Sequence, residues 1–235
     1  LGREVGEPLW PERWDLPALE QIQAGMSSYW WRSLYGQDAS NPEGTEFLAE
    51  YFDDILVSEE DWPTEFERVA MAVDPSKGSA TGDYSGIIKL SEADGKLYVE
   101  SDLCRVGVAE LCKRIIDFAE TGCDGLLLES NSFQALLEEP INRMMEERNS
   151  VPFPIYPITS LTNKTLRIKR LDFWLKRRFL RFRDTESNQL LIGQLMDFPF
   201  GDHDDGPDGL EMSLRLWKHL KQGASISDAP ERIWT

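Results

Sequence analysis

The order of apolar and polar positions along the chain predicts a mixed α/β domain that begins near residue 66. Short apolar runs that end at turn residues, such as Asp74-Pro75 and Asp94-Gly95, indicate buried strands, and apolar positions at helical spacing indicate amphipathic helices. Strands are expected over 68–73, 84–90, 97–103, 125–128 and 153–158. Helices are expected over 107–121, up to Arg148, and near 163–176, 186–196 and 205–220.

The first 65 residues have a different pattern of apolar and polar positions. Two short helices are expected over 16–23, with Asp15 as N-cap, and over 27–35, and a loop over 36–44 follows. We therefore expect an N-terminal arm over residues 1–65, the end of an upstream domain. A single domain should then span 66–222, with a C-terminal tail over 223–235.

Composition narrows the class of protein. The 235 residues are 41 % hydrophobic and include 8 Trp, which is typical of a globular chain and not of an acidic disordered tail. No apolar run approaches the roughly 18–20 residues that cross a bilayer, so no membrane partner is expected. Three cysteines without a Cys-x-x-Cys pair indicate neither a disulfide framework nor structural zinc, which favours a reduced intracellular setting.

Charge is segregated along the chain. The formal net charge is −17, which argues against a surface that coats nucleic acid everywhere. Between Lys164 and Arg183, however, nine basic residues occur with only one acid. This cationic strip suits a local grip on a phosphate backbone, and the alternative is a solvated amphipathic helix. The residues proposed to contact DNA are Lys164, Arg167, Arg170, Arg177 and Arg178.

Acids at the ends of two buried strands are the candidate chemistry. Asp74 follows one apolar run and Glu129 follows another, so parallel neighbouring strands would place both carboxylates at one edge of the sheet. The alternative for each acid alone is a turn cap. Four more acids lie in the segment 202–208, where Asp205 and Asp208 share one face at the start of a predicted helix.

Crowded carboxylates repel one another unless a cation neutralises them, and hard oxygen ligands select Mg²⁺ or Mn²⁺. The alternative is an anionic cluster that complements the helix dipole. Other chemistries find less support. The glycine spacing 78–82–86 lacks the Gly-Lys-Ser/Thr ending of a phosphate-binding loop, and no base can be paired with a cysteine nucleophile. His203 could assist proton transfer, although a hydrogen bond at the helix start is the simpler interpretation.

Four motifs in order carry a resemblance to a known family. They are Val73-Asp74-Pro75-Ser76-Lys77-Gly78, Gly82-Asp83-Tyr84-Ser85-Gly86-Ile87, Leu128-Glu129-Ser130-Asn131, and Phe198-Pro199 with His203-Asp204-Asp205-Gly206-Pro207-Asp208-Gly209-Leu210. Over about residues 66–220 the chain resembles the nuclease domain of the large terminase subunit of tailed bacteriophages. The stretch 35–47 is similar to the connection that follows the ATPase domain of that family.

The resemblance implies an RNase H-like α/β fold, with a mixed five-stranded sheet flanked by helices and an antiparallel meander of the first three strands. It also implies metal-dependent cutting of concatemeric double-stranded DNA, with two divalent ions, Mg²⁺ or Mn²⁺. By position, the catalytic and metal-binding acids are Asp74, Glu129, Asp205 and Asp208. Asp204 is an adjacent candidate ligand, and Asp83 is a second-tier one.

The resemblance further implies a place in viral genome packaging. Packaging would occur in the host cytoplasm at the procapsid portal, with the portal and the small terminase subunit contacted through the full-length protein. No ATPase motif occurs in this chain, so we expect a nuclease part separated from its upstream ATPase domain.

The leading hypothesis is phosphodiester hydrolysis in which Asp74 bridges two ions about 3.5–4 Å apart. Glu129 would hold one ion, and Asp205 or Asp208 the other. Two alternatives stay open. The chain could be a non-catalytic docking or DNA-contact module of the packaging motor, which its acidic body favours. It could also be a nuclease similar to junction resolvases.

Overall fold

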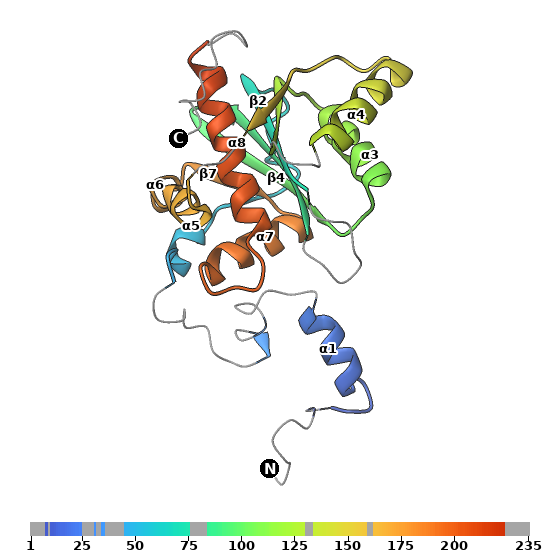
Figure 1. Ribbon diagram of the computed structural model, residues 1–235. Coiled ribbons are helices and arrows are strands. Elements are labelled where there is room, and N and C mark those ends of the chain that lie inside the picture. Colours follow the sequence, from blue (N-terminus) through green and yellow to red (C-terminus); the bar gives the residue numbers. More distant parts are fainter. Residues whose placement is uncertain are drawn as a thin grey trace.

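The computed structural model describes residues 8, 10–24, 31, 34–35, 45–75, 84–129, 134–158 and 162–223, and its centre is a mixed β-sheet (Figure 1). The strands are β1 (Leu56–Val57), β2 (Arg68–Asp74), β3 (Ser85–Ala93), β4 (Lys96–Cys104), β5 (Gly125–Glu129), β6 (Ile155–Ile158) and β7 (Leu180–Arg183). They form a seven-stranded sheet in the order β1-β7-β4-β3-β2-β5-β6. The α/β prediction is confirmed, but the expected count of five strands is wrong.

The middle of the sheet is the predicted meander. β2 pairs antiparallel with β3, and β3 pairs antiparallel with β4. The Asp94-Gly95 turn joins β3 to β4 with positive φ at both residues, 50° and 71°, as a tight hairpin turn of this hand requires. Asp94-Gly95 was a strong turn signal in the sequence, and the structure confirms it.

Parallel pairs extend the sheet on both sides. β5 lies parallel to β2 and to β6, whereas β7 lies parallel to β4 and to β1. The two strands that the sequence did not predict, β1 and β7, are both at one edge. β1 has only two residues, and β7 alternates Leu-Arg-Phe-Arg inside the cationic strip, where its charges hid the period of two.

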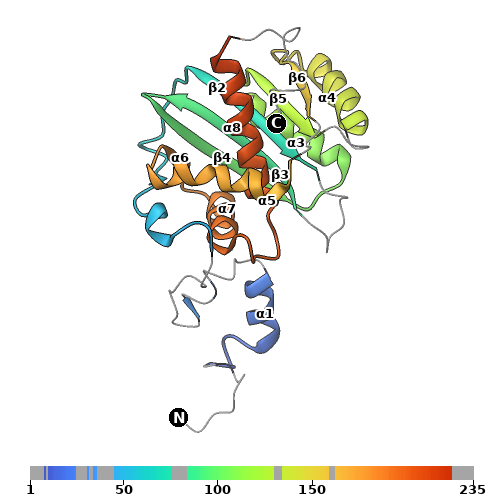
Figure 2. The ribbon, with the colours of Figure 1, turned by 60° about the vertical axis from the view of Figure 1, so that its left-hand side comes forward.

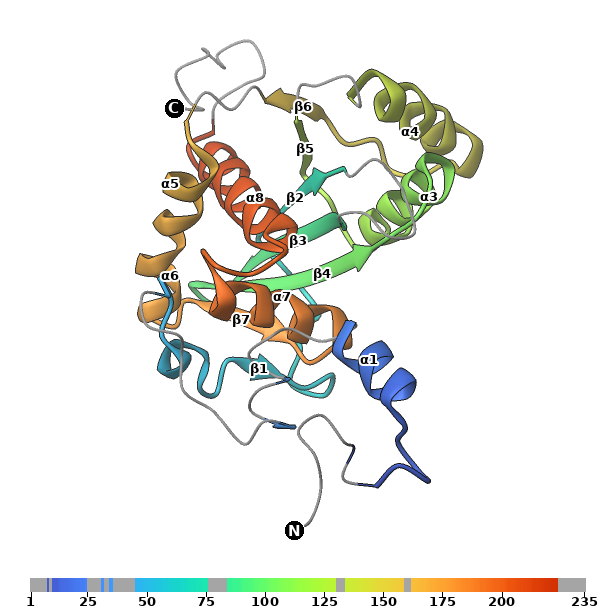
Figure 3. The ribbon, with the colours of Figure 1, turned by 60° about the horizontal axis from the view of Figure 1, so that its bottom comes forward.

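Helices cover both faces of the sheet, which gives three layers (Figures 2 and 3). One face carries α7 (Glu186–Asp197) and α8 (Asp205–Lys221), with α5 (Lys164–Ile168), η2 (Lys169–Leu171) and α6 (Asp172–Lys176) packed alongside. The other face carries α3 (Val108–Ala119) and α4 (Gln134–Arg148). Each face has its own apolar core, and within the described residues no helix is both long and apolar enough to cross a membrane.

The helices predicted after residue 100 are confirmed to within a few residues, except that one of them is divided into three short helices. The expected helix over 163–176 consists of α5, η2 and α6 in direct succession. In the arm, α1 (Leu16–Ala24) begins where the sequence placed it, and the Asp15 carboxylate accepts a hydrogen bond of 2.9 Å from the Ala18 N–H. Most of the second expected arm helix, over 27–35, lies outside the described residues, as does the tail from 224 onward.

The segment from residue 45 to β1 belongs to the main core. Phe47, Tyr51 and Ile55 are buried in the same apolar core as the inner faces of α7 and α8. Tyr51 belongs to the short helix η1 (Ala49–Phe52). Phe47 stacks on Phe198 with ring centroids 5.9 Å apart, and the Glu46 N–H donates to the Phe198 carbonyl at 3.0 Å. The packed domain therefore starts about twenty residues before the predicted boundary at 65. The origin of residues 1–65 in an upstream ATPase domain stays a prediction.

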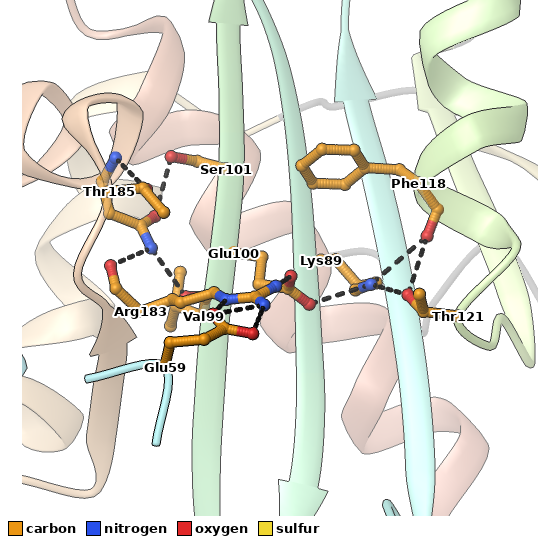
Figure 4. A network of polar contacts seen from close by, with 10 residues as sticks. Glu59, Lys89, Val99, Glu100, Ser101, Phe118, Thr121, Arg183 and Thr185 are labelled. Carbon is orange, nitrogen blue, oxygen red and sulfur yellow. Dashed lines mark hydrogen bonds and ion pairs between the residues drawn. The ribbon is translucent and has the colours of Figure 1, made fainter. Parts of the chain in front are cut away.

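A chain of ionic contacts crosses the sheet on the side of α3 (Figure 4). Arg183 of β7 pairs with Glu59 and, at 2.5 Å, with Glu100 of β4. Glu100 also accepts from the buried Lys89 of β3 at 2.8 Å. Lys89 in turn donates to Thr121 and to the carbonyl of Phe118 at the end of α3. These contacts fix the register of three strands with groups that would be costly to leave unsatisfied.

Candidate active site

Asp74 and Glu129 end two neighbouring strands. β2 and β5 are parallel, and Val73 is the register partner of Leu128. Asp74 and Glu129 are the next residues on these strands, so both leave the sheet at the same edge, where both are partly exposed. The structure confirms the predicted position of both acids.

The first turn of α8 brings the other acids to this edge. α8 begins at Asp205, with Asp204 as its N-cap residue and Asp208 in its first turn. A Cβ on Gly86 of β3 would lie 3.2 Å from the Asp205 carbonyl oxygen, so the helix starts directly against the sheet. The Asp205 carboxylate accepts a hydrogen bond of 3.1 Å from the Tyr84 N–H, which fixes it next to β3.

The four predicted catalytic acids interact through their charges. Burial raises the pKa of the Asp74 carboxyl to about 7, against the opposing charge of Lys164. Three neighbouring carboxylates, those of Asp208, Asp205 and Glu129, add to the rise in this pKa. Burial also raises the pKa of Asp208, and Glu129 contributes to that rise. Acids that are far apart in the sequence therefore share one cluster at the carboxyl ends of β2 and β5.

Lys164 of α5 lies among these acids. Its Nζ is 2.9 Å from Oδ1 of Asp204 and 3.6 Å from Oδ2 of both Asp74 and Asp208. Burial alone would lower the pKa of the Lys164 ammonium, but the surrounding carboxylates outweigh it and raise this pKa. Lys164 is thus an internal counter-ion of the acid cluster, a position that its place in a charge run did not predict.

Arg167, one turn further along α5, also faces the acids. Its Nη2 donates to Oδ2 of Asp208 at 2.9 Å, and both side chains are about 95 % buried. The prediction that Arg167 contacts DNA is therefore wrong, because the three-residue spacing from Lys164 turns both cations inward. The other oxygen of Asp208, Oδ1, is buried without a hydrogen-bond partner.

The remaining residues of the cationic strip lie further from the acids. Arg170 has a half-exposed side chain that is 3.9 Å from Glu211. Arg177 lies over the ring of Phe173, with 4.4 Å from Cζ to the ring centre. Arg178 donates to the Glu50 carbonyl. The strip is thus divided between the acid cluster and a second group in η2 and directly after α6. The DNA contacts of Arg170, Arg177 and Arg178 stay predictions.

The donor set fits a divalent ion in its chemistry, although its members do not converge on a common point. Among the described residues, no three His, Cys, Asp or Glu side chains form a group arranged to hold a metal. Two observations nevertheless suit a cation. The Oδ1 of Asp208 is an acceptor without a donor, and burial together with three neighbouring carboxylates raises the pKa of Asp74 against the charge of Lys164.

A second cluster beside the acids was missed by the sequence reasoning. The Arg105 guanidinium lies 4.0 Å above the Tyr84 ring, and His203 packs edge-on against the same ring. These residues come from three elements that only the fold unites, so spacing along the chain gave no signal for Arg105. Asp83, the second-tier acid, lies outside the described residues, as do Ser130 and Asn131 of the third motif.

Solved structures with a similar fold are viral nucleases. The human cytomegalovirus terminase nuclease domain, soaked with Mn and bound to an inhibitor, aligns with a TM-score of 0.52 at 12 % identity, over 73 % of this chain and 95 % of that one. Another structure of this cytomegalovirus domain gives a TM-score of 0.50 at 12 % identity, over 71 % and 92 %. The fold is that of a terminase nuclease domain.

The similarity to the cytomegalovirus domains lies in the fold, because only 12 % of the aligned residues are identical. The large terminase of a thermophilic bacteriophage aligns with a TM-score of 0.43 at 12 % identity, over 73 % of this chain and 42 % of that one. No protein-family model matches the chain, and no curated protein matches it.

Proposed function

We propose that this chain is a divalent-metal-dependent endonuclease domain that cuts concatemeric double-stranded DNA during viral genome packaging. The observation that carries the proposal is the meeting of Asp74, Glu129, Asp205 and Asp208 at one edge of a terminase-nuclease fold. The Mn soak of the similar cytomegalovirus domain supports the use of a divalent ion.

The chain's own residues divide the work as follows. Asp74 is central, since its charge interacts with each of the other three acids, and it would contact both ions. Glu129 would hold one ion from β5, and Asp205 or Asp208 the other from α8, with Asp204 at the rim. Mg²⁺ or Mn²⁺, when bound there, supplies an activated water and stabilises the charge that develops on the leaving oxygen.

Substrate and partners follow from the same proposal. Arg170 in η2 and Arg177 and Arg178 after α6 would contact DNA phosphates, which gives little sequence preference and a steep dependence on salt. Through the full-length protein, the domain would act with an ATPase domain, the portal and the small terminase subunit. The site of action would be the host cytoplasm, at the procapsid portal.

The test is nicking of supercoiled plasmid in Mg²⁺ or Mn²⁺. Asp74→Asn should abolish nicking while circular dichroism stays unchanged, because the substitution removes a charge without removing volume. Asp117→Asn is the matched control, since Asp117 lies on α3 and pairs with Arg148 at the surface, and it should retain full activity. Cleavage by purified Asp74→Asn at the wild-type rate would refute the assignment.

One observation favours the docking module as a second candidate. Lys164 neutralises part of the acid cluster, and the carboxylates do not form a ready metal group among the described residues. If the wild-type domain binds duplex DNA but cuts at no metal concentration, docking is the better description. Cleavage confined to four-way junctions would instead favour a function similar to junction resolvases.

A further inference from the structure

Three side chains form a compact cluster next to the acids. Arg105 follows the last residue of β4, Tyr84 precedes β3, and His203 precedes α8. The Arg105 guanidinium stacks on the Tyr84 ring, with 4.0 Å from Cζ to the ring centre. His203 meets the same ring edge-on, with ring centres 5.1 Å apart. The guanidinium is therefore held in one orientation by the Tyr84 ring and His203.

The hydrogen bonding of Arg105 leaves its charge available. Its Nη2 lies 3.3 Å from Nε2 of His203, and because a guanidinium only donates, this imidazole nitrogen must accept. No carboxylate among the described residues pairs with Arg105, and its Nε is a buried donor that lacks an acceptor. In a chain with a net charge of −17, an oriented arginine without an acidic partner is a site for an external anion.

Strand pairing places this cluster two positions along the strands from the acids. Ser85 of β3 pairs with Cys104 of β4, so Tyr84 and Arg105 lie directly beyond these paired strand ends. On the other side of β3, Gly86 pairs with Asp74. The backbone of Tyr84 also donates to the Asp205 carboxylate. An anion on Arg105 would thus lie beside the acid cluster, on the β4 side.

We propose that Arg105 binds a DNA phosphate and positions the duplex backbone next to the acids. The inference rests on the proposed nuclease function and adds a substrate contact outside the cationic strip. A planar guanidinium presents paired N–H donors that match the fork of two phosphate oxygens, and stacking on Tyr84 lowers the cost of ordering it. The role of Arg105 is to position substrate, whereas the acids carry the chemistry.

The first experiment measures binding without cleavage, by fluorescence anisotropy of a short labelled duplex in Ca²⁺. Arg105→Gln should bind roughly tenfold more weakly, the lower limit for losing a hydrogen bond between charged groups. It should also reduce the slope of log K against log salt by about 1, as the loss of one phosphate contact does. Arg148→Gln is the matched control, because Arg148 pairs with Asp117 away from the acids, and its affinity and slope should equal those of the wild type.

The second experiment separates phosphate binding from a structural role of the cluster. Arg105→Lys keeps the charge but loses the planar fork, so its affinity should fall between those of wild type and Arg105→Gln. Tyr84→Phe keeps the stacking ring and should retain wild-type affinity, whereas Tyr84→Leu should lose affinity in the same direction as Arg105→Gln. Thermal melting of each variant shows whether the fold is intact.

The outcomes distinguish this inference from the proposed function. If wild type cuts plasmid and folded Arg105→Gln binds duplex with unchanged affinity and salt slope, the phosphate role of Arg105 is refuted while the nuclease stands. If wild type binds duplex but never cuts, and Arg105→Gln still weakens binding, the DNA contact stands and the nuclease fails. If Arg105→Gln and Arg105→Lys both bind duplex as tightly as wild type, the cluster has a structural role, which is to hold the start of α8.

Discussion

At the scale of single residues, the site depends on how buried charges are compensated. Asp208 and Arg167 form an ion pair of 2.9 Å inside the molecule, and α8 adds Glu211 and Arg215 at 2.9 Å from each other. Buried charges lose their hydration, so such pairs contribute little net stability, yet removing one partner leaves the other charge uncompensated. The Arg167–Asp208 pair instead fixes the position of Oδ2 of Asp208, while Oδ1 has no hydrogen-bond partner.

Removing the cation of this pair should therefore be costly. We expect Arg167→Leu to lower the free energy of unfolding by about 3–5 kcal/mol, the range for breaking a buried ion pair. Arg170→Leu, on the same helical segment but half-exposed and 3.9 Å from its acid, should cost less than about 1 kcal/mol. Urea denaturation measures both, and equal losses in the two variants would contradict the argument.

Glu92 gives a pH dependence that is remote from the acid cluster. Burial alone would raise its pKa, but hydrogen bonds from Lys221 and Trp217 and the charge of Arg68 lower it below the ordinary value. A lowered pKa in the folded state means that Glu92 stabilises the fold above its unfolded-state pKa and loses this contribution as the pH falls through the folded-state value.

We expect Glu92→Gln to destabilise the protein at neutral pH, and the deficit relative to wild type should shrink progressively as the pH falls below about 4, because the wild-type carboxyl is protonated first in the unfolded state and then, at lower pH, in the folded state. Urea titrations over this range measure the difference. Glu60→Gln, at an exposed position, is the control and should follow wild type at every pH. A deficit that stays constant with pH would show that the charge of Glu92 is not involved.

The sequence revealed the acids of the site but not their partners. Asp74 and Glu129 could be predicted because parallel neighbouring strands bring acids at their carboxyl ends to one edge of the sheet. Arg167 was misassigned and the contacts of Lys164 with the acids were not foreseen, since a run of basic residues does not show which of its members point inward. Arg105 gave no signal, because its neighbours Tyr84 and His203 are brought to it by strand pairing.

At the scale of elements, α8 is the helix on which the site depends. A Cβ on Gly209 would lie 2.8 Å from Cγ1 of Ile88 on β3. One turn later, Ser213 donates its hydroxyl hydrogen to the Ile88 carbonyl at 2.9 Å. Small residues thus let the helix backbone approach the sheet closely, which brings Asp205 and Asp208 to the level of the strand ends.

Gly209→Ala should destabilise the protein although alanine is the better helix former. Propensity alone favours Ala by up to about 1 kcal/mol, whereas overpacking against Ile88 costs about 1–3 kcal/mol, so we expect a net loss near 1 kcal/mol. Lys218→Ala, at an exposed position of the same helix, should change stability by less than about 0.5 kcal/mol. A more stable Gly209→Ala protein would show that α8 can move away from β3 without cost.

Helices and strands were predictable where a single hydrophobic periodicity dominated their sequence. β2, β3 and β5 are apolar runs or alternations with clear turn signals, and α8 has apolar positions at helical spacing. β1 is stabilised by pairing with β7 and by the core beneath it, not by its two residues. No local pattern encodes such pairing, so the edge of the sheet could not be predicted from the sequence.

At the scale of the whole molecule, the negative charge of the acid cluster exceeds the positive charge that Lys164 places beside it. Asp74 has a pKa of about 7 because burial and three carboxylates outweigh the compensation by Lys164. A protein whose site favours a further cation should be stabilised when that cation is added, since binding to the folded state alone shifts the unfolding equilibrium.

We expect MnCl₂ to raise the melting temperature of the wild-type domain. At a hundred times the dissociation constant, the gain of about 2.7 kcal/mol corresponds to roughly 5–10 °C for a domain of this size. Asp74→Asn and Asp208→Asn should reduce or abolish the rise, and Asp117→Asn should retain it. Identical shifts in all four proteins would place the bound Mn²⁺ elsewhere on the acidic surface.

The docking of Glu46 and Phe47 has a mechanical consequence. Both contact Phe198, in the loop that leads from α7 to the acids at the start of α8. Lys169, just after α5, adds an ion pair to Glu46 at 2.5 Å. Tension applied to the chain before Thr45 would therefore reach the Phe198 loop and the α5 segment before it reached any strand. Such tension would act first on the segments that carry Asp204, Asp205 and Lys164.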